Sequence, residues 1–526
     1  MQTAKWQTRQ ARMFSDAQHA PLAGGLPPSP PIDYDRMFDL DSFANGQDRD
    51  DVIRRLRILG AKDGLMDALD PRITITNPLA ANDDKTPHPT HPNRNPNNPN
   101  EDMTVGFTFL GQFIDHDITL DPAPLNAPAT TGPNLRIPFL NLDNIYGRGP
   151  DLDRIFYDRE SELDREAPIQ FFVDDAAPRD LPRTSQQRAI IADPRNDENV
   201  IISQLHLAFL KFHNRVTAYL AEEKAAALAL LHPTARPRAL FKMTQQTVRW
   251  HYQHIVVHQY LAASLNDAIF AAVRDKTVPS LFTVTGRPWL PREFQVAAFR
   301  FGHSQIRPGY KVNSGFGAPI FDVRIDPDEN DPNDLRGGRR GARRFVEWDT
   351  FFDFGTLEVA PADAAGTAAV TQPKVKPNKR IDPFISTPMF ELPVGPGLIE
   401  PGDEQASLAG RNLERHLLHD LPSGQAIANF LGYSILSAPE LTDLDFHDNT
   451  PLWYYILKEA LEQEGGERLG QVGSRIVAEV IFGLLRGDPD SYFRTNPTWV
   501  PDLPRRNGSV TGAFTMVDLL TFAGVA

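Results

Sequence analysis

The sequence predicts a mainly α-helical fold with long irregular connections and little β-structure. Apolar residues recur at helical spacing in several long segments, whereas the strict alternation of apolar and polar residues that marks half-buried strands is almost absent. The chain also has 46 prolines, which fits stiff connections between helices.

The clearest predicted helix covers residues 199–221, where Ile201, Leu205, Phe212 and Val216 fall on one apolar face. The run at 103–119 is apolar, with polar groups inserted near its end. Further helices are expected at 50–68 (short and amphipathic), 238–265, 292–303 and 423–435.

Several segments have the composition of loops. Residues 83–100 and 123–134 are rich in proline, and 360–380 are rich in Ala, Pro and Lys. The Gly/Arg run LRGGRRGARR at 335–344 lacks interleaved aromatic residues, so a solvated surface loop is favoured over a nucleic-acid contact. We expect residues 1–34 to form an N-terminal arm and residues 35–526 to form one domain.

Composition excludes several functional classes. The net charge of -14 argues against nucleic-acid binding as a main role. The absence of cysteine excludes disulfides, iron–sulfur clusters and thiolate haem ligands. No membrane-length apolar run and no conventional signal peptide is visible, so a soluble protein is expected, either cytoplasmic or secreted by a signal-independent route.

One polar cluster interrupts an apolar segment. Gln112, Asp115, His116 and Asp117 fall within six residues of the run at 103–119. Burying these groups without partners costs several kcal/mol, on the order of 2–7 for a single polar group. The cluster is therefore either exposed at a helix end or paired with a metal, a cofactor or an arginine.

Other polar residues allow two interpretations each. Gly302 leaves room beside His303 for a flat ligand, although His303 could equally be a hydrogen-bonded core residue. Arg195 and Glu198 precede the helix at 199–221, where charged residues also serve as helix caps. No P-loop, dinucleotide-binding fingerprint or nucleophile elbow is present.

In combination and in order, four blocks make the sequence resemble the animal-type haem peroxidases of the peroxidase–cyclooxygenase superfamily. The blocks are GQFIDHD at 111–117, DPRNDEN at 193–199 running into HLAFLKFHNR at 206–215, FRFGH at 299–303 and RNLERHLLHDLP at 411–422. This resemblance covers residues 35–480 and implies a single large helical haem-peroxidase domain.

The resemblance also implies catalytic roles. His116 corresponds to the distal acid–base histidine, Arg195 to the distal arginine and Gln112 to the residue that orients water or halide. His303 corresponds to the proximal ligand of the haem iron, and Asn412 to the acceptor of its Nδ1–H. The expected reaction reduces hydrogen peroxide and oxidises a small donor (halide, thiocyanate or phenol) through a ferryl intermediate.

Cofactor contacts follow in the same way. The cofactor is expected to be haem b, and Asp115 and Glu198 match the carboxylates that form ester bonds to it in the family. Arg415 matches a propionate partner, and Arg300 is a weaker candidate for the same role. Asn199 replaces a methionine that forms a sulfonium link in some members, which excludes that third bond.

A calcium ion is a further expectation from the resemblance. Asp117 would be a ligand, together with the carbonyl of Phe139 and side-chain oxygens of Asn141 and Asp143. Oxygen ligands suit Ca²⁺. Ile137 replaces a hydroxyl ligand and Asn141 a carboxylate, so a reduced affinity is expected.

Three rival functions remain. Fatty-acid dioxygenases of the same superfamily need a radical-forming tyrosine three residues before the proximal histidine, where this chain has Arg300. A non-catalytic adhesion or matrix protein would be expected to lose the distal or proximal residues, and all are present. A metallohydrolase could use His254 and His258, but Ile255 stands where such an enzyme needs a glutamate.

Overall fold

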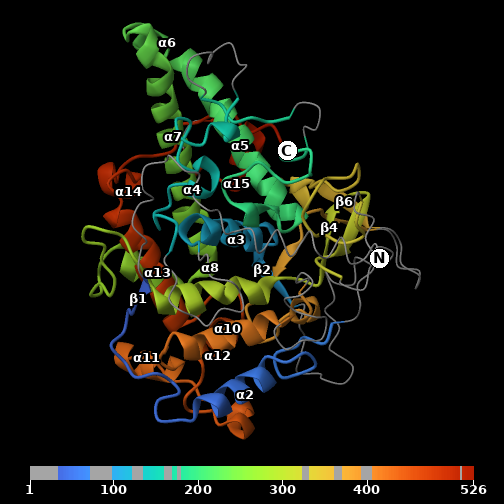
Figure 1. The fold of residues 1–526 in the computed structure, drawn as a ribbon, viewed down its shortest axis with the longest axis vertical. Coiled ribbons are helices and arrows are strands. Elements are labelled where there is room, and N and C mark those ends of the chain that lie inside the picture. Colours follow the sequence, from blue (N-terminus) through green and yellow to red (C-terminus); the bar gives the residue numbers. More distant parts are fainter. Residues whose placement is uncertain are drawn as a thin grey trace.

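Helix α3 (Gly106–Ile118) lies near the middle of the fold (Figure 1). The computed structural model describes residues 34–70, 98–120, 134–158, 169–174, 179–322, 331–360, 370–392, 406–509 and 512–526. Most of α3 is buried, and it packs against α5 and against the helical segment that carries His303. At Gly111 a β-carbon would lie 2.5 Å from the Tyr260 hydroxyl, so glycine permits this close packing.

Two long helices form a hairpin above α3. Helix α5 (Val200–Glu223) begins at Asn199, whose side chain accepts hydrogen bonds from the backbone of Ile201 and Ile202. It connects through α6 (Ala225–Ala229) to α7 (Arg236–Ile255), which packs against it (Figure 1). A π-helical turn (Val256–Leu261) and α8 (Ala262–Ser264) continue α7, so the helices predicted at 199–221 and 238–265 are confirmed.

The segment predicted as a helix at 292–303 is helical but changes type along its length. Residues Glu293–Ala297, labelled η6, form a π-helix, and residues Ala298–Gln305, labelled η7, form a 3-10 helix. Such departures from α-helical geometry are frequent at functional sites. The change of winding sets the direction in which His303 leaves the backbone.

Helices from the last quarter of the chain lie below this segment (Figure 1). Ser423 caps α11 (Gly424–Leu431), which confirms the helix expected at 423–435 but ends it at the left-handed Gly432. Helices α10 (Leu408–Leu418) and α12 (Leu452–Glu464) also lie there. Helix α13 (Gln471–Gly487) lies beside the segment and packs against it. The shorter helices are α2 (Arg49–Leu59), α4 (Asp143–Tyr146), α9 (Asp267–Arg274), α14 (Tyr492–Thr495) and α15 (Met516–Phe522).

The strands of the described residues form four separate pairs, in agreement with the prediction of little β-structure. One pair is parallel, β1 (Tyr34–Asp35) with β3 (Leu290–Pro291). The antiparallel pairs are β2 (Pro99–Thr104) with β8 (Pro377–Lys379), β4 (Gly309–Asn313) with β5 (Phe316–Pro319), and β6 (Leu357–Ala360) with β7 (Val370–Pro373).

The prediction of a surface loop at 360–380 is therefore wrong for the residues that form β7 and β8. Lys379 on β8 is fully buried because its ammonium group donates to Asp382 at 2.9 Å and to the carbonyl of Phe384 at 2.8 Å. The loops expected at 83–100 and 123–134, and the arm at 1–34, lie almost wholly outside the described residues.

The segment 335–344 is a loop, as expected, and Arg339 is exposed, but the expectation of a solvated surface loop is wrong for Arg336 and Arg344. Arg344 is fully buried and Arg336 is 3% exposed, because the carbonyls and carboxylates around them accept their hydrogen bonds. Arg340 reaches Asp197 at 3.1 Å. A β-carbon at Gly337 would lie 1.5 Å from the backbone oxygen of Asp197, so only glycine fits there. The run packs tightly against the 195–199 segment and fixes its position.

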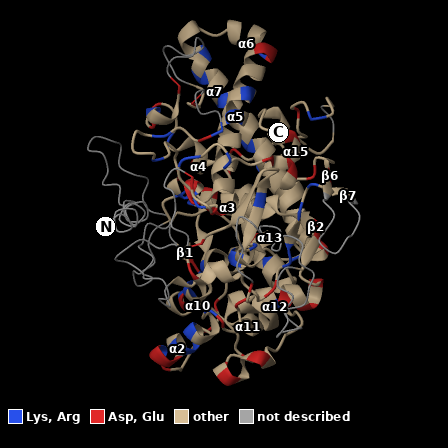
Figure 2. Cartoon of the chain, turned by 90° about the vertical axis from the view of Figure 1, so that its right-hand side faces the viewer, with Lys and Arg blue, Asp and Glu red and all other residues tan. Residues whose placement is uncertain are grey.

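Charged residues of both signs occur along the whole length of the described chain (Figure 2). Some also lie in the interior beside α3. Among the described helices, none is long and apolar enough to cross a bilayer.

Candidate haem and peroxide site

The predicted distal histidine lies on the last turn of α3. His116 is 5% exposed, and its Nδ1 lies 2.7 Å from Oδ1 of Asn196. Burial, reinforced by the charge of Arg195, lowers the pKa of His116 to about 4. Its ring is therefore neutral near pH 7 and able to accept a proton.

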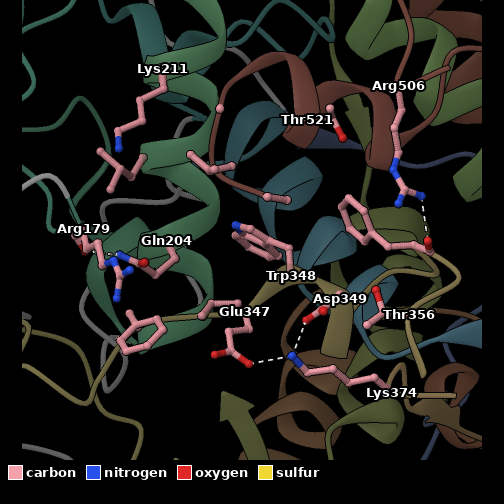
Figure 3. Close-up of a pocket in the computed structure, with 17 residues that line it drawn as sticks. Arg179, Gln204, Lys211, Glu347, Trp348, Asp349, Thr356, Lys374, Arg506 and Thr521 are labelled. Atoms are coloured by element: carbon pink, nitrogen blue, oxygen red, sulfur yellow. Dashed lines mark hydrogen bonds and ion pairs between the residues drawn. The ribbon is translucent and has the colours of Figure 1, made fainter. Parts of the chain in front are cut away.

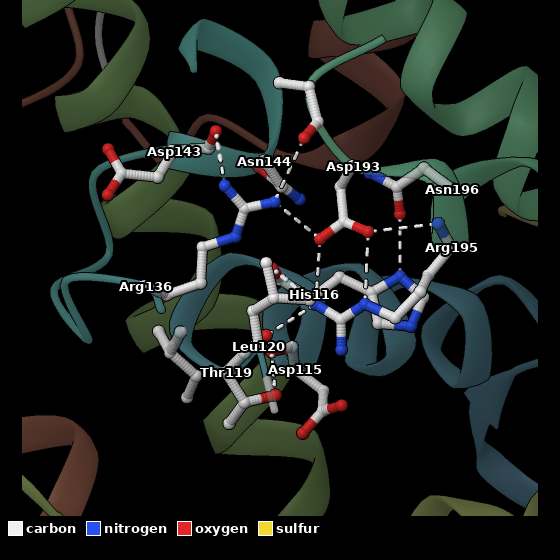
Figure 4. A network of polar contacts seen from close by, with 12 residues as sticks. Asp115, His116, Thr119, Leu120, Arg136, Asp143, Asn144, Asp193, Arg195 and Asn196 are labelled. Atoms are coloured by element: carbon white, nitrogen blue, oxygen red, sulfur yellow. Dashed lines mark hydrogen bonds and ion pairs between the residues drawn. The ribbon is translucent and has the colours of Figure 1, made fainter. Parts of the chain in front are cut away.

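Arg195 lies beside His116 and is held from behind by Asp193. The carboxylate of Asp193 caps the short 3-10 helix Pro194–Asp197 and accepts from Nε of Arg195 at 3.1 Å and from Nη2 at 2.8 Å (Figure 4). Nη2 also donates to the carbonyls of His116, at 3.2 Å, and of Thr119. These contacts occupy Nε and Nη2 and dock the guanidinium onto the end of α3, which leaves Nη1 for another ligand.

Gln112 lies one turn before His116 on α3. Its amide nitrogen donates to Glu198 at 3.3 Å, and its oxygen accepts from the side chain of Asn199 at 3.4 Å. Burial raises the pKa of Glu198 to about 7. The predicted neighbours Gln112, Glu198 and Asn199 are thus brought together.

Asp115 points away from Asp117, toward the segment of His303. Its Oδ1 is buried and has no hydrogen-bond partner among the described residues, and its Oδ2 lies 3.8 Å from Nη1 of Arg300. Burial tends to raise the pKa of Asp115, but the charges of Arg300 and Arg195 outweigh it and lower that pKa. A charged carboxylate at this point is therefore stabilised by two arginines.

The predicted proximal histidine lies on the 3-10 helix η7. Nδ1 of His303 is 2.8 Å from the side-chain nitrogen Nδ2 of Asn412 on α10, and burial lowers the pKa of His303 to about 3. The neutral ring offers Nε2 as a ligand when its proton lies on Nδ1, which requires the amide oxygen of Asn412 to face Nδ1 instead. Apart from its chain neighbours, a β-carbon at Gly302 would meet nothing within 4 Å, so open space adjoins the backbone next to His303. Arg415, one turn after Asn412, lies near enough for its charge to lower the pKa of His303 further.

Seven of the predicted catalytic and haem-binding residues share one pattern of exposure, whereas His116 and Asn412 are buried. The seven keep part of their surface accessible although most neighbours along the same elements are fully buried. Burial is still the largest influence on the pKa of Asp115, Arg195, Glu198 and His303. These side chains keep some accessible surface although they lie in the interior of the protein, away from bulk solvent. This combination indicates that they line a shared internal space. The residues with this pattern are Gln112, Asp115, Arg195, Glu198, Arg300, His303 and Arg415.

The calcium candidates surround an unusual carboxylate. Asp117 is fully buried, and neither of its oxygens has a hydrogen-bond partner among the described residues. Burial and the nearby charge of Asp143 raise the pKa of Asp117 to about 8. Asn141 uses its side-chain oxygen to accept from the backbone of Asp143 at 3.1 Å, and the carbonyl of Phe139 accepts from the backbone of Asn141 at 2.8 Å.

The sequence reasoning missed several residues that hold these groups. Asp193, Asn196 and Arg136 support the distal side, and the DPRNDEN block contains the first two. Trp453 on α12 supports the proximal side, since its indole donates to the carbonyl of Arg300 at 3.1 Å and its ring lies edge-on to His303. A helical pattern around 452–464 is the signal that could have indicated Trp453.

The His254/His258 pair does not form a metal centre of the kind a metallohydrolase needs. The two rings lie 4.2 Å apart and tilted by 33°, and Nε2 of His258 contacts the hydroxyl of Tyr492 at 3.4 Å. Over the described part of the chain, no three His, Cys, Asp or Glu side chains converge as metal ligands.

A separate cavity of about 740 Å³ adjoins α5 and the end of the described chain (Figure 3). None of the predicted site residues lines it. Its charged groups are largely engaged with each other, since Lys374 contacts Glu347 at 2.6 Å and Asp349 at 2.8 Å. It carries no acid–base or ligand set comparable to that around His116 and His303.

Comparison with known proteins identifies relatives of both the sequence and the fold. Residues 134–328 match the family model for animal haem peroxidase, a stretch that includes Arg195 and His303. The chain is 22% identical over 308 residues to peroxinectin A of Dictyostelium discoideum, which covers 57% of this chain and 49% of that protein. It is 27% identical over 128 residues to dual oxidase of Drosophila melanogaster, covering 24% of this chain and 7% of the relative. The chain thus spans about half or less of these relatives.

Two solved structures share the fold. Peroxidase A from Dictyostelium discoideum superposes with a TM-score of 0.52 at 15% identity over 93% of both chains. A fatty acid alpha-dioxygenase from Oryza sativa superposes with a TM-score of 0.50 at 13% identity, over 84% of this chain and 74% of the other. At these identities the likeness establishes the helical fold and no activity. Residues 134–328 of this chain thus match the animal haem peroxidase family model, and its fold is similar to that of a peroxidase and of a fatty acid alpha-dioxygenase.

Proposed function

We propose that this protein is a haem peroxidase that reduces hydrogen peroxide and oxidises a small donor, such as a halide, thiocyanate or a phenol. The observation that carries the proposal is the arrangement of two neutral histidines on elements that pack together. His116 on α3 and His303 on η7 each contact an asparagine side chain through Nδ1, which leaves Nε2 of each ring for chemistry. The contact between Asp115 and Arg300 joins the same two elements.

The residues present fit a haem. The open space beside Gly302 suits a flat group next to the His303 ring, and His303 would ligate the iron through Nε2. The unpaired Oδ1 of Asp115 and the neutral form of Glu198 are carboxyl groups that would reach the haem edge. In our proposal these two carry the ester links, and Arg415 and Arg300 contact the propionates.

A haem bound there would supply the redox chemistry, which passes two oxidising equivalents from peroxide to the donor. His116 accepts a proton from peroxide at Nε2 and delivers it to the departing oxygen, a transfer worth about 10²–10⁴-fold in rate. Arg195 stabilises negative charge on that oxygen through its remaining Nη1. Gln112 orients the water or donor beside it.

On the other side, Asn412 controls the basicity of His303. An amide oxygen that accepts the Nδ1–H of an imidazole increases electron density at Nε2. In the structure Nδ2 of Asn412 lies 2.8 Å from Nδ1 of His303, so this role requires the amide to turn over and present its oxygen at the same distance. In the proposed enzyme Asn412 therefore favours cleavage of the O–O bond from the proximal side.

We also propose that Ca²⁺ binds at Asp117. A fully buried carboxylate with two unpaired oxygens is costly in isolation, and a hard cation would repay that cost. Asp143 would be a second carboxylate ligand, with Phe139 and Asn141 supplying neutral oxygens. The existing hydrogen bonds of Phe139 and Asn141 agree with the weakened affinity expected from sequence.

An absorption spectrum of the purified protein after haem supply tests the proposal. We expect a Soret band, a rapid spectral change on adding peroxide, and retention of haem after extraction with acidified solvent. A protein that acquires no Soret band overturns the assignment, and haem that extracts freely overturns the ester links. Oxygen uptake with linoleate would instead support a dioxygenase.

A further inference from the structure

Asn196 links two buried histidines that come from different helices. Its Oδ1 lies 2.7 Å from Nδ1 of His116 on α3, and its Nδ2 lies 2.9 Å from Nδ1 of His206 on α5. Asn196 and His206 are fully buried. In Figure 4 the side-chain oxygen of Asn196 faces a ring nitrogen of His116.

The chemistry of the amide decides where the protons lie. A carbonyl oxygen only accepts hydrogen bonds, so Nδ1 of His116 must carry the single proton of the neutral ring. Its Nε2 then presents a lone pair to the site. The amide nitrogen only donates, so Nδ1 of His206 must be the acceptor.

The tautomer of His206 is coupled to the orientation of the same amide. A reversed amide would face Nδ2 toward His116 and Oδ1 toward His206, which requires the proton of each ring to move to its other nitrogen. The orientation of one side chain is therefore coupled to the proton positions of two rings. Nε2 of His206 has no partner among the described residues, so the contact with Asn196 is its principal polar contact.

The backbone around Asn196 is held on both sides. Asp193 caps the 3-10 helix that contains it. Asp197, the next residue, is buried between Arg183 at 2.7 Å and Arg340 at 3.1 Å. The Asn196 amide is consequently presented to His116 from a rigid support.

We infer that Asn196, with His206 behind it, is a positioning residue that fixes the ring of His116 with Nε2 unprotonated. The inference rests on the proposed peroxidase function, in which His116 must accept a proton from peroxide. Neither Asn196 nor His206 touches the reacting atoms. Their effect is to keep His116 in the one tautomer that can begin the reaction.

The test compares Asn196→Leu with Asn196→Asp in haem-loaded protein. Leucine has a similar size but cannot bond either ring, whereas aspartate keeps the acceptor for Nδ1 of His116. The stretching frequency of CO bound to the ferrous protein reports whether a neighbouring ring offers an N–H or a lone pair. Stopped-flow mixing with peroxide gives the rate.

Wild-type protein should show one CO band. Asn196→Leu should add a second band at lower frequency and react with peroxide about 10- to 100-fold more slowly, a part of the full effect of acid–base catalysis. Asn196→Asp should restore the single band and most of the rate. His206→Met should change the CO band and the peroxide rate in the same direction as Asn196→Leu, but by less. It replaces Asn196→Leu as the test variant if Asn196→Leu does not fold.

Asn313→Leu is the matched control, because Asn313 is also buried and donates to two carbonyls at 2.8 Å, away from His116. It should leave the CO band and the rate unchanged. A single unshifted band with wild-type rate in Asn196→Leu and His206→Met overturns the inference alone. A wild-type protein that takes up no haem overturns the proposed function and the inference with it.

Discussion

Asp193 lies directly behind Arg195 and binds two of its nitrogens, Nε at 3.1 Å and Nη2 at 2.8 Å. The same carboxylate accepts from Nη2 of Arg136 at 2.6 Å. Burial would raise the pKa of Asp193, but the charges of Arg195 and Arg136 hold it well below its usual range. Asp193 is thus a buried anion that fixes the direction of Arg195.

Asp193→Asn should cost both stability and activity. Asp193 is fully buried, so removing its charge leaves Arg195 and Arg136 without their anion, which typically costs about 3–5 kcal/mol in the free energy of unfolding. The reaction with peroxide should also slow, because Arg195 is released. Urea unfolding and stopped-flow mixing measure the two effects. Asp275→Asn, which disrupts an exposed pair with Arg274, should change neither, and equal effects in both variants would contradict the role of Asp193.

The two site histidines should fail in different ways. His303→Ala removes the proposed iron ligand, so the protein should lose the wild-type Soret band. His116→Ala should keep the haem but lose its fast reaction with peroxide, because the ring proposed to accept and return the proton is gone. Spectra before and after peroxide separate the two results. Fast peroxide reaction in His116→Ala would rule out its proposed role.

The amphipathic helices were predictable because their signals are local. The apolar face of α5 and its cap at Asn199 can be read from the sequence. The adjacency of Gln112, Asp115, His116 and Asp117 was visible too, although the roles assigned to them came from the resemblance and not from periodicity. Asp115 is partly accessible whereas Asp117 is buried, so the two side chains face different surroundings.

The predictions that failed have a common cause. Whether a polar side chain is buried depends on partners that are distant in the sequence. Arg336 and Arg344 resemble surface residues in sequence, yet both are buried because acceptors from other segments surround them. Asn196 was passed over for the same reason, since His116 and His206 lie 80 and 10 residues away. The π-to-3-10 change at Ala298 is likewise set by packing against α3 and α12.

Calcium should stabilise the protein through Asp117. We expect added Ca²⁺ to raise the melting temperature and a chelator to lower it. Asp117→Asn should abolish this response while melting no lower than wild type in chelator, because burial raises the pKa of Asp117 to about 8 and the neutral amide replaces a carboxyl group that is itself largely neutral without the cation. Thermal melts with and without Ca²⁺ provide the measurement. A variant that still responds to Ca²⁺ as wild type does would exclude Asp117 as a ligand.

Acid should destabilise the fold through buried histidines such as His213. Its ring contacts the hydroxyl of Tyr146 at 3.0 Å and the carbonyl of Ile169 at 2.8 Å, and burial lowers its pKa to about 4. The unfolded ring has a pKa of about 6.5. Because the unfolded chain binds the proton first, stability is full above about pH 6.5 and falls as the pH drops toward about 4.

Urea midpoints measured across this window provide the test. His213→Gln should be less stable at neutral pH, since it loses the fixed ring contacts, but its stability should fall less steeply with acid. An unchanged acid dependence in this variant would mean that His213 does not bind a proton on unfolding.

Gly302→Ala separates folding from haem binding. In the ligand-free protein the added methyl group meets no atom within 4 Å, so its stability should match that of wild type. If a haem occupies the space beside His303, the same methyl group should collide with it and weaken haem uptake. Gly315→Ala is the matched control, because its β-carbon would meet only Asn313 at 3.6 Å, away from the site. Melting curves before haem addition and Soret titrations afterwards measure both quantities, and wild-type haem affinity in Gly302→Ala would show that the haem does not lie against this face of the ring.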